Sequence, residues 1–302
     1  MSLYPPPTTI KAEVFTRMPE TLRRKVRTQW ADFNKAGHPT DCFLEGPSFD
    51  RDGNLWVTDI PHGRVFKISA SGEWSQVTEY DGWPNGLKFH KDGRAFITDY
   101  KCGIMVLDPA SGKVTPLIET IRSESFKGVN DLHFAANGDL YFTDQGQTGL
   151  HDPTGRVYRY SADGKLVCLV NTIPSPNGIV LDLHERVVYV AVTRANAVWR
   201  LPIMPDGAVS KVGVAIQLSG GLSGPDGLAL DEEGGLVVAH AGMGCWRFDR
   251  LNRPTHFIQP GVGLFVTNIA FKGKRLYMTE SESGTILTAD LPAAGKAMYG
   301  PA

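Results

Sequence analysis

The sequence predicts an all-β protein, a six-bladed β-propeller with four antiparallel strands in each blade. First, a unit of about 15 residues recurs six times, at intervals of 40 to 49 residues. Second, most copies contain a turn dipeptide such as Asp-Gly or Asn-Gly between two apolar runs. Third, further runs rich in β-branched and aromatic residues follow the copies. Four antiparallel strands in a period of 40–50 residues are typical of a propeller blade.

The repeated unit joins the first two strands of each blade. The clearest copies read EGPSFDRDGNLWVTD, NGLKFHKDGRAFITD and NDLHFAANGDLYFTD. In each of these, the Asp-Gly or Asn-Gly pair lies where a tight hairpin tolerates positive φ. We call the first residue of each copy its opening residue: Glu45, Asn85, Asn130, Asn177, Asp226 and Thr267.

A strand near the N-terminus is expected to complete the last blade. The sixth copy has only three strand-like runs before the pattern ends near Leu291. The segment KAEVFTR, residues 11–17, is a candidate for its missing outer strand. Pairing there would join both ends of the chain in one blade and remove an exposed edge. Residues 1–302 are therefore expected to form a single domain.

Residues 18–44 are the only stretch that resembles a helix. Leu22, Val26 and Trp30 recur at helical spacing, and Gly37 followed by Pro39 ends the pattern. The segment is a candidate lid or cap over one face of the propeller. A helix that merely packs on the first blade is the alternative.

Composition excludes several classes of function. The formal net charge is -1, so the chain has no general attraction for nucleic acid or anionic membranes. Its N-terminus lacks the layout of a secretory signal, and no run of about 18 apolar residues suggests a membrane span. We expect a cytoplasmic protein that is a monomer or a small homo-oligomer. The four cysteines form no CxxC or Cys/His cluster, so buried thiols are expected rather than a zinc site.

The opening residues predict a cation site. In a propeller blade the first strand lies nearest the axis, so the six opening residues should meet at one end of the channel. All six carry a side-chain oxygen, and burying such groups without a partner costs free energy. Carboxylate and amide oxygens suit Ca²⁺, whereas Zn²⁺ or Cu²⁺ would call for His or Cys. The alternative, that these residues only form turns, explains Asn85, Asn177 and Asp226 but not Glu45.

Four motifs carry a resemblance to a known family. They are EGP at 45–47, ND at 130–131, SPNG at 175–178 and PDG at 225–227. With these motifs the sequence resembles the SMP-30/gluconolactonase/luciferin-regenerating family over roughly residues 43–290. The resemblance implies a six-bladed propeller that uses Ca²⁺, or another divalent cation such as Mg²⁺, Mn²⁺ or Zn²⁺, to hydrolyse lactones.

The resemblance also implies roles for individual residues. Glu45, Asn177 and Asp226 match the principal metal ligands, and Asn130 matches an asparagine that binds either metal or substrate. Asp226 and Asp131 match the carboxylates proposed as general base or proton carrier. Asp226 should ligate the cation directly, whereas strand alternation should turn Asp131 away from Asn130 and leave it unligated. A role for Asp131 in binding only neighbouring backbone is the alternative.

One departure bears on the substrate. Aldonolactonase-type members carry an arginine two residues before the Asn-Asp pair, where this chain has Gly128. A sugar lactone of the usual kind is therefore in doubt. The loop at residues 143–156 should lie on the active face, as should Trp30 and Trp83. The residues expected to contact substrate are Asn85, Asn130, Tyr100, Gln145 and His151.

The predicted activity is hydrolysis of a carboxylic ester bond, in which a small lactone is opened to its hydroxy acid. The cation would act as Lewis acid, and Asp226 or Asp131 would accept a proton from water. Two alternatives stay open. One is a non-catalytic Ca²⁺-binding or interaction propeller, because fold does not fix function. The other is a metal-free enzyme of the strictosidine synthase type.

Overall fold

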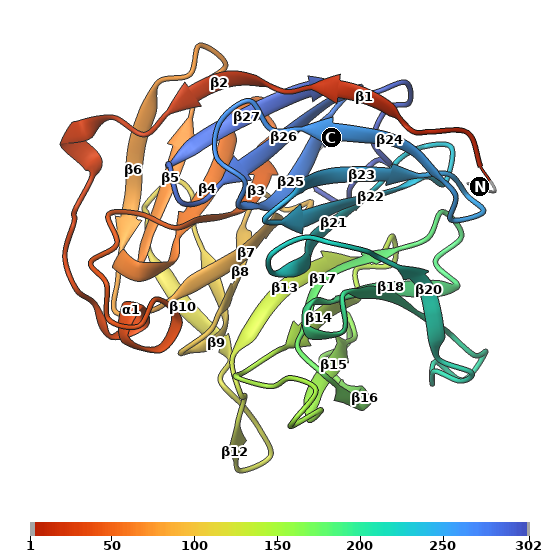
Figure 1. The fold of residues 1–302 in the computed structure, drawn as a ribbon. Coiled ribbons are helices and arrows are strands. Elements are labelled where there is room, and N and C mark those ends of the chain that lie inside the picture. Colours follow the sequence, from red (N-terminus) through yellow and green to blue (C-terminus); the bar gives the residue numbers. More distant parts are fainter. Residues whose placement is uncertain (1–3, 301–302) are drawn as a thin grey trace.

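The computed structural model describes residues 4–300. It confirms the predicted six-bladed β-propeller, with four antiparallel strands in every blade (Figure 1). The inner strands, in blade order, are β3 (Leu44–Phe49), β7 (Pro84–Phe89), β13 (Val129–Phe134), β17 (Pro176–Leu181), β21 (Gly224–Leu230) and β25 (Val266–Lys272). The second strands are β4 (Leu55–Asp59), β8 (Ala95–Asp99), β14 (Leu140–Asp144), β18 (Val187–Val192), β22 (Leu236–Ala241) and β26 (Arg275–Glu280).

The outer half of each blade is formed by its third and fourth strands. The third strands are β5 (Arg64–Ile68), β9 (Gly103–Leu107), β15 (Gly155–Tyr160), β19 (Ala197–Pro202), β23 (Gly244–Phe248) and β27 (Thr285–Asp290). The fourth strands are β6 (Trp74–Glu79), β10 (Val114–Ile118), β16 (Leu166–Ile173), β20 (Gly213–Gln217), β24 (Pro254–Gln259) and β2 (Glu13–Arg17). A two-stranded hairpin, β11 (Thr120–Ile121) with β12 (Glu124–Ser125), projects after β10.

The N-terminal region closes the ring, as predicted. Strand β2 pairs antiparallel with β27 and supplies the fourth strand of the last blade. The predicted strand at 11–17 is divided in two, because Lys11 belongs to a separate strand, β1 (Thr8–Lys11). Strand β1 pairs parallel with β24 and adds a fifth strand to the fifth blade. Both strands lie along one side of the ring in Figure 1.

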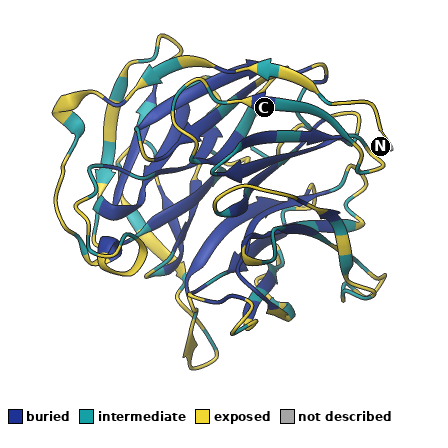
Figure 2. Cartoon of the chain, viewed as in Figure 1, coloured by how far each residue is buried: buried dark blue, intermediate teal, exposed yellow. Residues whose placement is uncertain are grey.

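The core lies between neighbouring blades. Inner and second strands are almost wholly buried, whereas the outer strands are partly exposed (Figure 2). Leu44 of the first blade packs in one cluster with Ile286 of the last, and Phe96 of the second blade packs with Phe134 of the third. Burial of these apolar faces joins each sheet to the next.

A β-bulge interrupts every inner strand at or next to its opening residue. In the first blade, for example, the register shifts between Glu45 and Ser48. Equivalent shifts occur in the other five inner strands. Bulges re-aim side chains next to functional sites, and here they turn residues at the upper end of the channel inward. We call the end with the opening residues the upper end and the opposite end the lower end.

The recurring Thr-Asp pair at the end of each of the first three second strands holds these bulges in place. The hydroxyl of Thr58 donates to the carbonyl of Asn85 in the next blade at 2.6 Å, and Thr143 does the same for Asn177 at 2.8 Å. The aspartate instead accepts a backbone N–H from its own blade, as Asp59 does from Phe43 at 2.7 Å. The repeat therefore positions the opening residues from both sides.

Residues 18–44 contain a short helix, as predicted, but it does not follow the spacing of Leu22, Val26 and Trp30. Leu22 ends a 3₁₀ turn, Glu20–Leu22, and Val26 is exposed in an extended bridge to Thr40. Among residues 4–300 the only α-helix is α1 (Gln29–Asn34), capped by Thr28, whose hydroxyl accepts the N–H of Ala31 at 3.2 Å. The helical spacing misleads because only Trp30 among the three apolar residues is deeply buried.

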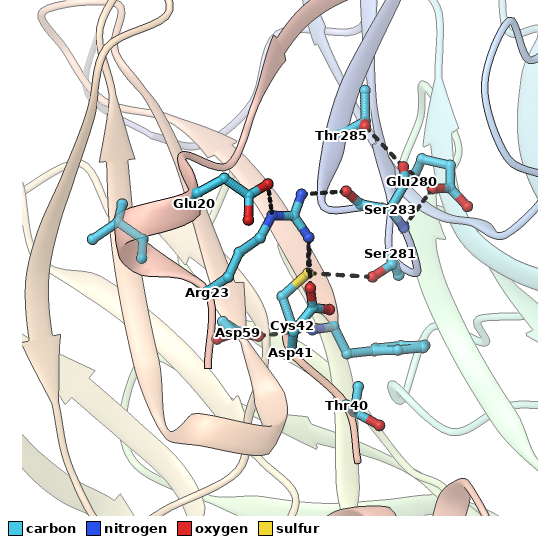
Figure 3. A network of polar contacts seen from close by, with 12 residues as sticks. Glu20, Arg23, Thr40, Asp41, Cys42, Asp59, Glu280, Ser281, Ser283 and Thr285 are labelled. Atoms are coloured by element: carbon cyan, nitrogen blue, oxygen red, sulfur yellow. Dashed lines mark hydrogen bonds and ion pairs between the residues drawn. The ribbon is translucent and has the colours of Figure 1, made fainter. Parts of the chain in front are cut away.

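An extended, charged stretch anchors this segment instead of a longer helix. The Arg23 guanidinium donates to Asp41 at 2.8 Å and to the carbonyl of Ser283 in the last blade at 2.6 Å (Figure 3). Glu280 accepts the N–H groups of Phe265 and Ser283 beside this network. The segment therefore fastens the first blade to the sixth before α1 reaches the upper face.

The four cysteines differ in their exposure. Cys42 and Cys245 are buried thiols, but Cys168 is exposed and Cys102 is only half-buried, so the prediction of buried cysteines holds for two of the four. Within residues 4–300, no helix has the length and apolar character needed to cross a membrane.

Candidate functional site

Four of the opening residues are buried at the upper end of the channel: Glu45, Asn85, Asn130 and Asn177. Asp226 lies among them and keeps partial contact with solvent. Glu45 is fixed by two hydrogen bonds to one carboxylate oxygen, Oε2, from the N–H of Gly46 and the side-chain amide of Asn268, both at 2.9 Å. The Thr267 hydroxyl also acts on this carboxylate as a hydrogen-bond donor.

The sixth opening residue does not join this group. The Thr267 hydroxyl donates to the carbonyl of Leu44 at 3.1 Å and contacts the hydroxyls of Thr279 and Ser281. Its place is taken by the next residue, Asn268, whose amide reaches Glu45 and Asp131. A neutral threonine hydroxyl is satisfied by backbone and hydroxyl partners inside the wall, whereas the longer amide reaches the axis.

A second layer of residues lies just beneath the opening residues. The positions that follow the opening residues are glycine in four blades: Gly46, Gly86, Gly178 and Gly227. In the other two blades they are Asp131 and Asn268. A Cβ on Gly86 would come within 2.6 Å of Asp131 Oδ1, and one on Gly227 would overlap the Asn268 amide. The glycines therefore leave room for one carboxylate and one amide on the axis.

Asp131 differs in part from its prediction. Its direction does differ from that of Asn130, because Asn130 donates to Gln145 at 2.8 Å while Asp131 accepts from the Asn268 amide at 3.5 Å. It also accepts the N–H of Leu132 at 2.8 Å. It is not withdrawn from the centre, however, since its charge acts on both Glu45 and Asp226. The contact with neighbouring backbone exists beside the axial one.

Three carboxylates in one buried space make each other harder to ionise. Burial raises the pKa of Glu45 to about 7, and the charge of Asp131 adds to the rise. Burial also raises the pKa of Asp226 well above its ordinary range, with contributions from Glu45 and Asp131. The pKa of Asp131 is raised by burial as well, although the positive charge of Lys88 opposes this. A positive charge among these carboxylates would offset their mutual repulsion.

The oxygen atoms of this site fit a hard divalent cation. The amide oxygens of Asn85 and Asn177 are buried and have no hydrogen-bond partner in the described part of the chain, which is costly unless something else satisfies them. Asn130 gives its N–H to Gln145, and this leaves its own oxygen free. No group of three or more His, Cys, Asp or Glu residues suited to a metal occurs in residues 4–300. The fit therefore rests on two carboxylates, Glu45 and Asp226, together with amide oxygens, a donor set preferred by Ca²⁺.

An aromatic wall rises beside the site. Tyr100 packs against Gly128, where any Cβ would overlap the tyrosine ring. Trp83 lies next to Tyr100, with ring centroids 6.3 Å apart, and Phe33 of α1 covers Trp83 at 6.1 Å. Gln147 donates to the Tyr100 hydroxyl at 3.3 Å. The space beside Gly128 is thus filled by an aromatic ring from the neighbouring blade.

The loop at residues 145–154 forms another part of the upper rim. Gln145 bridges Asn130 and the hydroxyl of Ser175, to which it donates at 2.9 Å. His151 lies against Gly149 beside Arg194, so both predicted residues of this loop are on the upper face. Gln145 is engaged with the asparagine, which makes it a positioning residue for Asn130.

Comparison with known proteins assigns the family. The profile described as SMP-30/Gluconolactonase/LRE-like region matches residues 43–282. Lactonase drp35 of Staphylococcus aureus strain MRSA252 is 32% identical over 226 residues, which span 71% of this chain and 67% of that protein. This chain belongs to the SMP-30/gluconolactonase/LRE-like family.

Solved structures share the fold. A gluconolactonase from Xanthomonas campestris aligns with a TM-score of 0.74 at 20% identity, over 96% of this chain and 99% of that one. The calcium-binding protein regucalcin from Agrobacterium tumefaciens aligns with a TM-score of 0.74 at 22% identity, over 97% and 98% of the two chains. Virginiamycin B lyase from Staphylococcus aureus aligns less closely, with a TM-score of 0.61 at 14% identity over 82% and 80%. At these identities the likeness shows the fold alone.

The family segment, residues 43–282, contains every opening residue but neither α1 nor the C-terminal residues. Within it, sequence reasoning missed two residues of the site. Asn268 could have been found from its place next to Thr267, which mirrors that of Asp131 next to Asn130. Arg194 is exposed on the loop between β18 and β19, and its charge acts on both Asp226 and Tyr100. Arg194 stands alone in a loop, and no pattern in the sequence indicates that it belongs to the site.

Proposed function

We propose that this protein hydrolyses a lactone with the help of a divalent cation, Ca²⁺ in the first instance, held by Glu45, Asn130, Asn177 and Asp226. The observation that carries the proposal is the pairing of mutually repelling carboxylates with amide oxygens that have no partner. A cation would offset the repulsion and satisfy the amides at once. Relatives named lactonase and gluconolactonase support the same reaction class.

The cation supplies a Lewis acid that polarises the lactone carbonyl and offsets the charge that develops on its oxygen. The residues of this chain do the remaining work. Glu45 is held in one orientation by Gly46 and Asn268, and Asn130 by Gln145. These bonds keep the ligand oxygens directed toward the axis before substrate arrives, which avoids reorganisation during the reaction.

Asp131 is the residue we propose as general base. It lies beneath the opening residues, and its burial raises its pKa above that of an ordinary aspartate. A carboxylate that ligates a dication has its pKa lowered by the opposite charge, which makes Asp226 the weaker base of the two. Asp131 would take a proton from the attacking water and return it to the ring oxygen as the acyl C–O bond breaks, so that this oxygen leaves as the hydroxyl of the product.

The upper wall favours a lactone with an apolar body over a sugar lactone. At Gly128, the Tyr100 ring fills the space where a side chain from the same blade would project. Trp83 and Phe33 extend this apolar surface toward α1. Arg194 makes no hydrogen bond or ion pair within the described chain, lies beside the 145–154 loop, and acts through its charge on both Asp226 and Tyr100. It is therefore placed to bind a substrate oxygen near the carboxylates.

Chelation and a panel of lactones test the proposal. We expect the purified protein to open one or more aliphatic or aromatic lactones, to lose this activity after chelation, and to regain it with Ca²⁺ or another divalent cation. Glu45→Gln should lose both bound metal and activity, whereas Glu73→Gln, an exposed glutamate on the β5–β6 turn, should keep both.

Other results would favour the alternatives. Activity that survives complete removal of metal would favour a metal-free propeller enzyme. Tight Ca²⁺ binding without hydrolysis of any lactone in the panel would favour a binding protein. A full equivalent of metal in Glu45→Gln would show that the ligand set is wrong.

A further inference from the structure

A cavity lies at the lower end of the channel. Its volume is about 400 Å³, and it is lined by residues from the inner strands of all six blades. Lys88 and His133 line it, and each lies three residues after an opening residue, Asn85 or Asn130. At ~3.3 Å per strand residue, this places them about 10 Å below the upper site. The cavity is therefore axial and separate from the predicted cation site.

The C-terminal segment at 295–300 closes this cavity from below. Gly295 forms a β-bridge with Asp231, and the N–H of Lys296 donates to the carbonyl of Leu230 at 2.8 Å. Tyr299 packs against Phe134 with ring centroids 5.5 Å apart. The segment lies outside the region that matches the family profile, residues 43–282. Its contacts hold it as a fixed floor of the cavity.

Three side chains with nitrogen donors line the cavity: Lys88, His133 and Lys296. His133 is only 3% exposed and makes no hydrogen bond within residues 4–300, although it lines the cavity. The ammonium of Lys88 has one long contact, at 3.4 Å, with the carbonyl of Pro47. Lys296 is better satisfied, since it donates to the carbonyl of Asp182 at 3.0 Å and lies 3.5 Å from Glu185. Lys88 and His133 therefore keep unused hydrogen-bonding capacity toward the cavity.

Negative charge also lies near these groups, but its carboxylate oxygens are engaged with other donors. Asp50 lines the cavity, but its carboxylate accepts from Asn54 and from the indole of Trp56, at 2.8 to 2.9 Å. Asp131 lies above and interacts with Lys88. Burial and the charges of Lys296 and Lys88 lower the pKa of His133 to about 3, so its ring is neutral and offers one donor and one acceptor.

The remaining walls are apolar. Aromatic and aliphatic side chains from several blades surround the polar groups: Phe49, Phe89, Phe134, Val180, Leu228, Phe271 and Tyr299. Water in this cavity would leave the phenylalanine rings exposed to solvent. An ion without an apolar part would not cover these rings either. The volume is within the ~300–1,000 Å³ typical of small-molecule pockets.

We propose that the lower cavity binds a small organic anion, whose charged oxygens lie at Lys88 and His133 and whose apolar body packs against the phenylalanine rings. This inference does not rest on the proposed lactonase activity. It requires only the unpartnered His133, the weakly engaged Lys88 and the apolar walls. Phenylacetate is a compact example, because it has a carboxylate for the polar groups and a ring for the apolar walls.

Calorimetric titration with phenylacetate tests the proposal, with phenylacetamide as the uncharged probe of the same shape and inorganic phosphate as the anion without an apolar body. We expect one molecule of phenylacetate per chain to bind, and the other two probes to bind at least about tenfold more weakly. Equal binding of phenylacetamide would overturn the assignment of an anion site, and equal binding of phosphate would overturn the role of the apolar walls.

Variants locate the binding. Lys88→Met should weaken phenylacetate binding at least about tenfold, while Lys113→Met, an exposed lysine on the β9–β10 turn, should not change it. Ala270→Leu fills the cavity without removing a polar group, and should abolish binding in a protein that still melts cooperatively. This second variant keeps the test decisive if Lys88→Met fails to fold.

Glu45→Gln separates the two ends of the channel. We expect it to bind phenylacetate within about threefold of the unaltered protein, whatever its activity toward lactones, because charges separated by the Asp131 layer interact only weakly. Binding that is lost in Glu45→Gln but kept in Lys88→Met and Ala270→Leu would place the ligand at the upper site and overturn the proposal. Binding unchanged in all three variants would place it elsewhere on the molecule, with the same consequence.

Discussion

The two ends of the central channel are built from the same six strands, yet they carry opposite chemistry. At the upper end, Glu45, Asp131 and Asp226 crowd together with amide oxygens that lack partners. At the lower end, Lys88 and His133 face apolar walls. The depth along an inner strand, rather than the blade to which it belongs, decides which chemistry a side chain meets.

The layer between the ends links them electrostatically. Asp131 interacts with Glu45 and Asp226 above it and with Lys88 below it. A change of charge at either end is therefore felt at the other, with Asp131 in the middle. Substitutions at either end therefore test how strongly the two ends are coupled.

The largest expected effect distinguishes the two aspartates of the upper end. Asp226→Ala should lose bound cation and activity together, because one of only two ligand carboxylates is removed. Asp131→Asn should keep the cation but lose about 10²–10⁴-fold in kcat, the usual contribution of a general base. Metal content and steady-state kinetics of both variants check this. Near-normal kcat in metal-loaded Asp131→Asn would exclude it as the base.

The stability of the metal-free protein should depend on pH in a way set by Glu45. Because its pKa is raised from 4.5 to about 7 in the folded state, its contribution is fully present below pH 4.5 and is lost as pH rises through 7. In chelator, Glu45→Gln should therefore gain Tm relative to the unaltered protein between pH 5 and pH 8, by about 2–5 °C. Excess Ca²⁺ should reverse the order at pH 8. An order independent of pH and of metal would contradict the raised pKa.

Arg194 should affect substrate binding more than turnover. Arg194→Ala removes the guanidinium at the upper rim, and we expect KM to rise about tenfold with little change in kcat, since a charged hydrogen bond to substrate is lost. Arg200→Ala, an exposed arginine on β19 of the same blade, is the matched control. Equal KM values for Arg194→Ala and Arg200→Ala would show that Arg194 does not bind substrate.

The smallest effect concerns the link between the two ends. Lys88→Met removes a positive charge that opposes cation binding through Asp131. We expect its affinity for Ca²⁺ to rise by about threefold, because charges separated by this layer interact with less than ~1 kcal/mol. Calcium titration of Lys88→Met against Lys113→Met measures this difference. A weaker affinity for Ca²⁺ would mean that Lys88 supports the upper site through its packing and not its charge.

The repeat made the fold predictable from sequence. Six copies with the same turn chemistry define the inner and second strands, and the missing outer strand of the sixth copy pointed to residues 11–17, of which 13–17 pair there. The position of the short helix within residues 18–44 was predicted poorly, because the spacing of apolar residues alone cannot show which of them are buried. Trp30 packs against Phe43 and is buried, whereas Val26 at the same spacing lies in solvent.

The upper site was predictable only in part. Residues at the start of each copy could be placed at one height, because all copies align. The sequence could not show that Thr267 would satisfy its hydroxyl inside the wall while Asn268 reached the axis. Contacts between loops of different blades, such as that of Tyr100 with Gly128, depend on how the blades are arranged. The lower cavity depends in addition on the path of the C-terminal segment.

The pairing of β2 with β27 sets the order of events during synthesis. Residues 13–17 leave the ribosome about 270 residues before their partners at 285–288 are made. Contacts so distant in sequence form slowly, because a long loop must close first. Until then β2 has no partner and the sixth blade is incomplete, so that unpaired strand edges remain open to another nascent chain, whereas β1 can already pair with β24 of the fifth blade. Chaperone dependence and aggregation of chains truncated before residue 285 should therefore reflect this last closure.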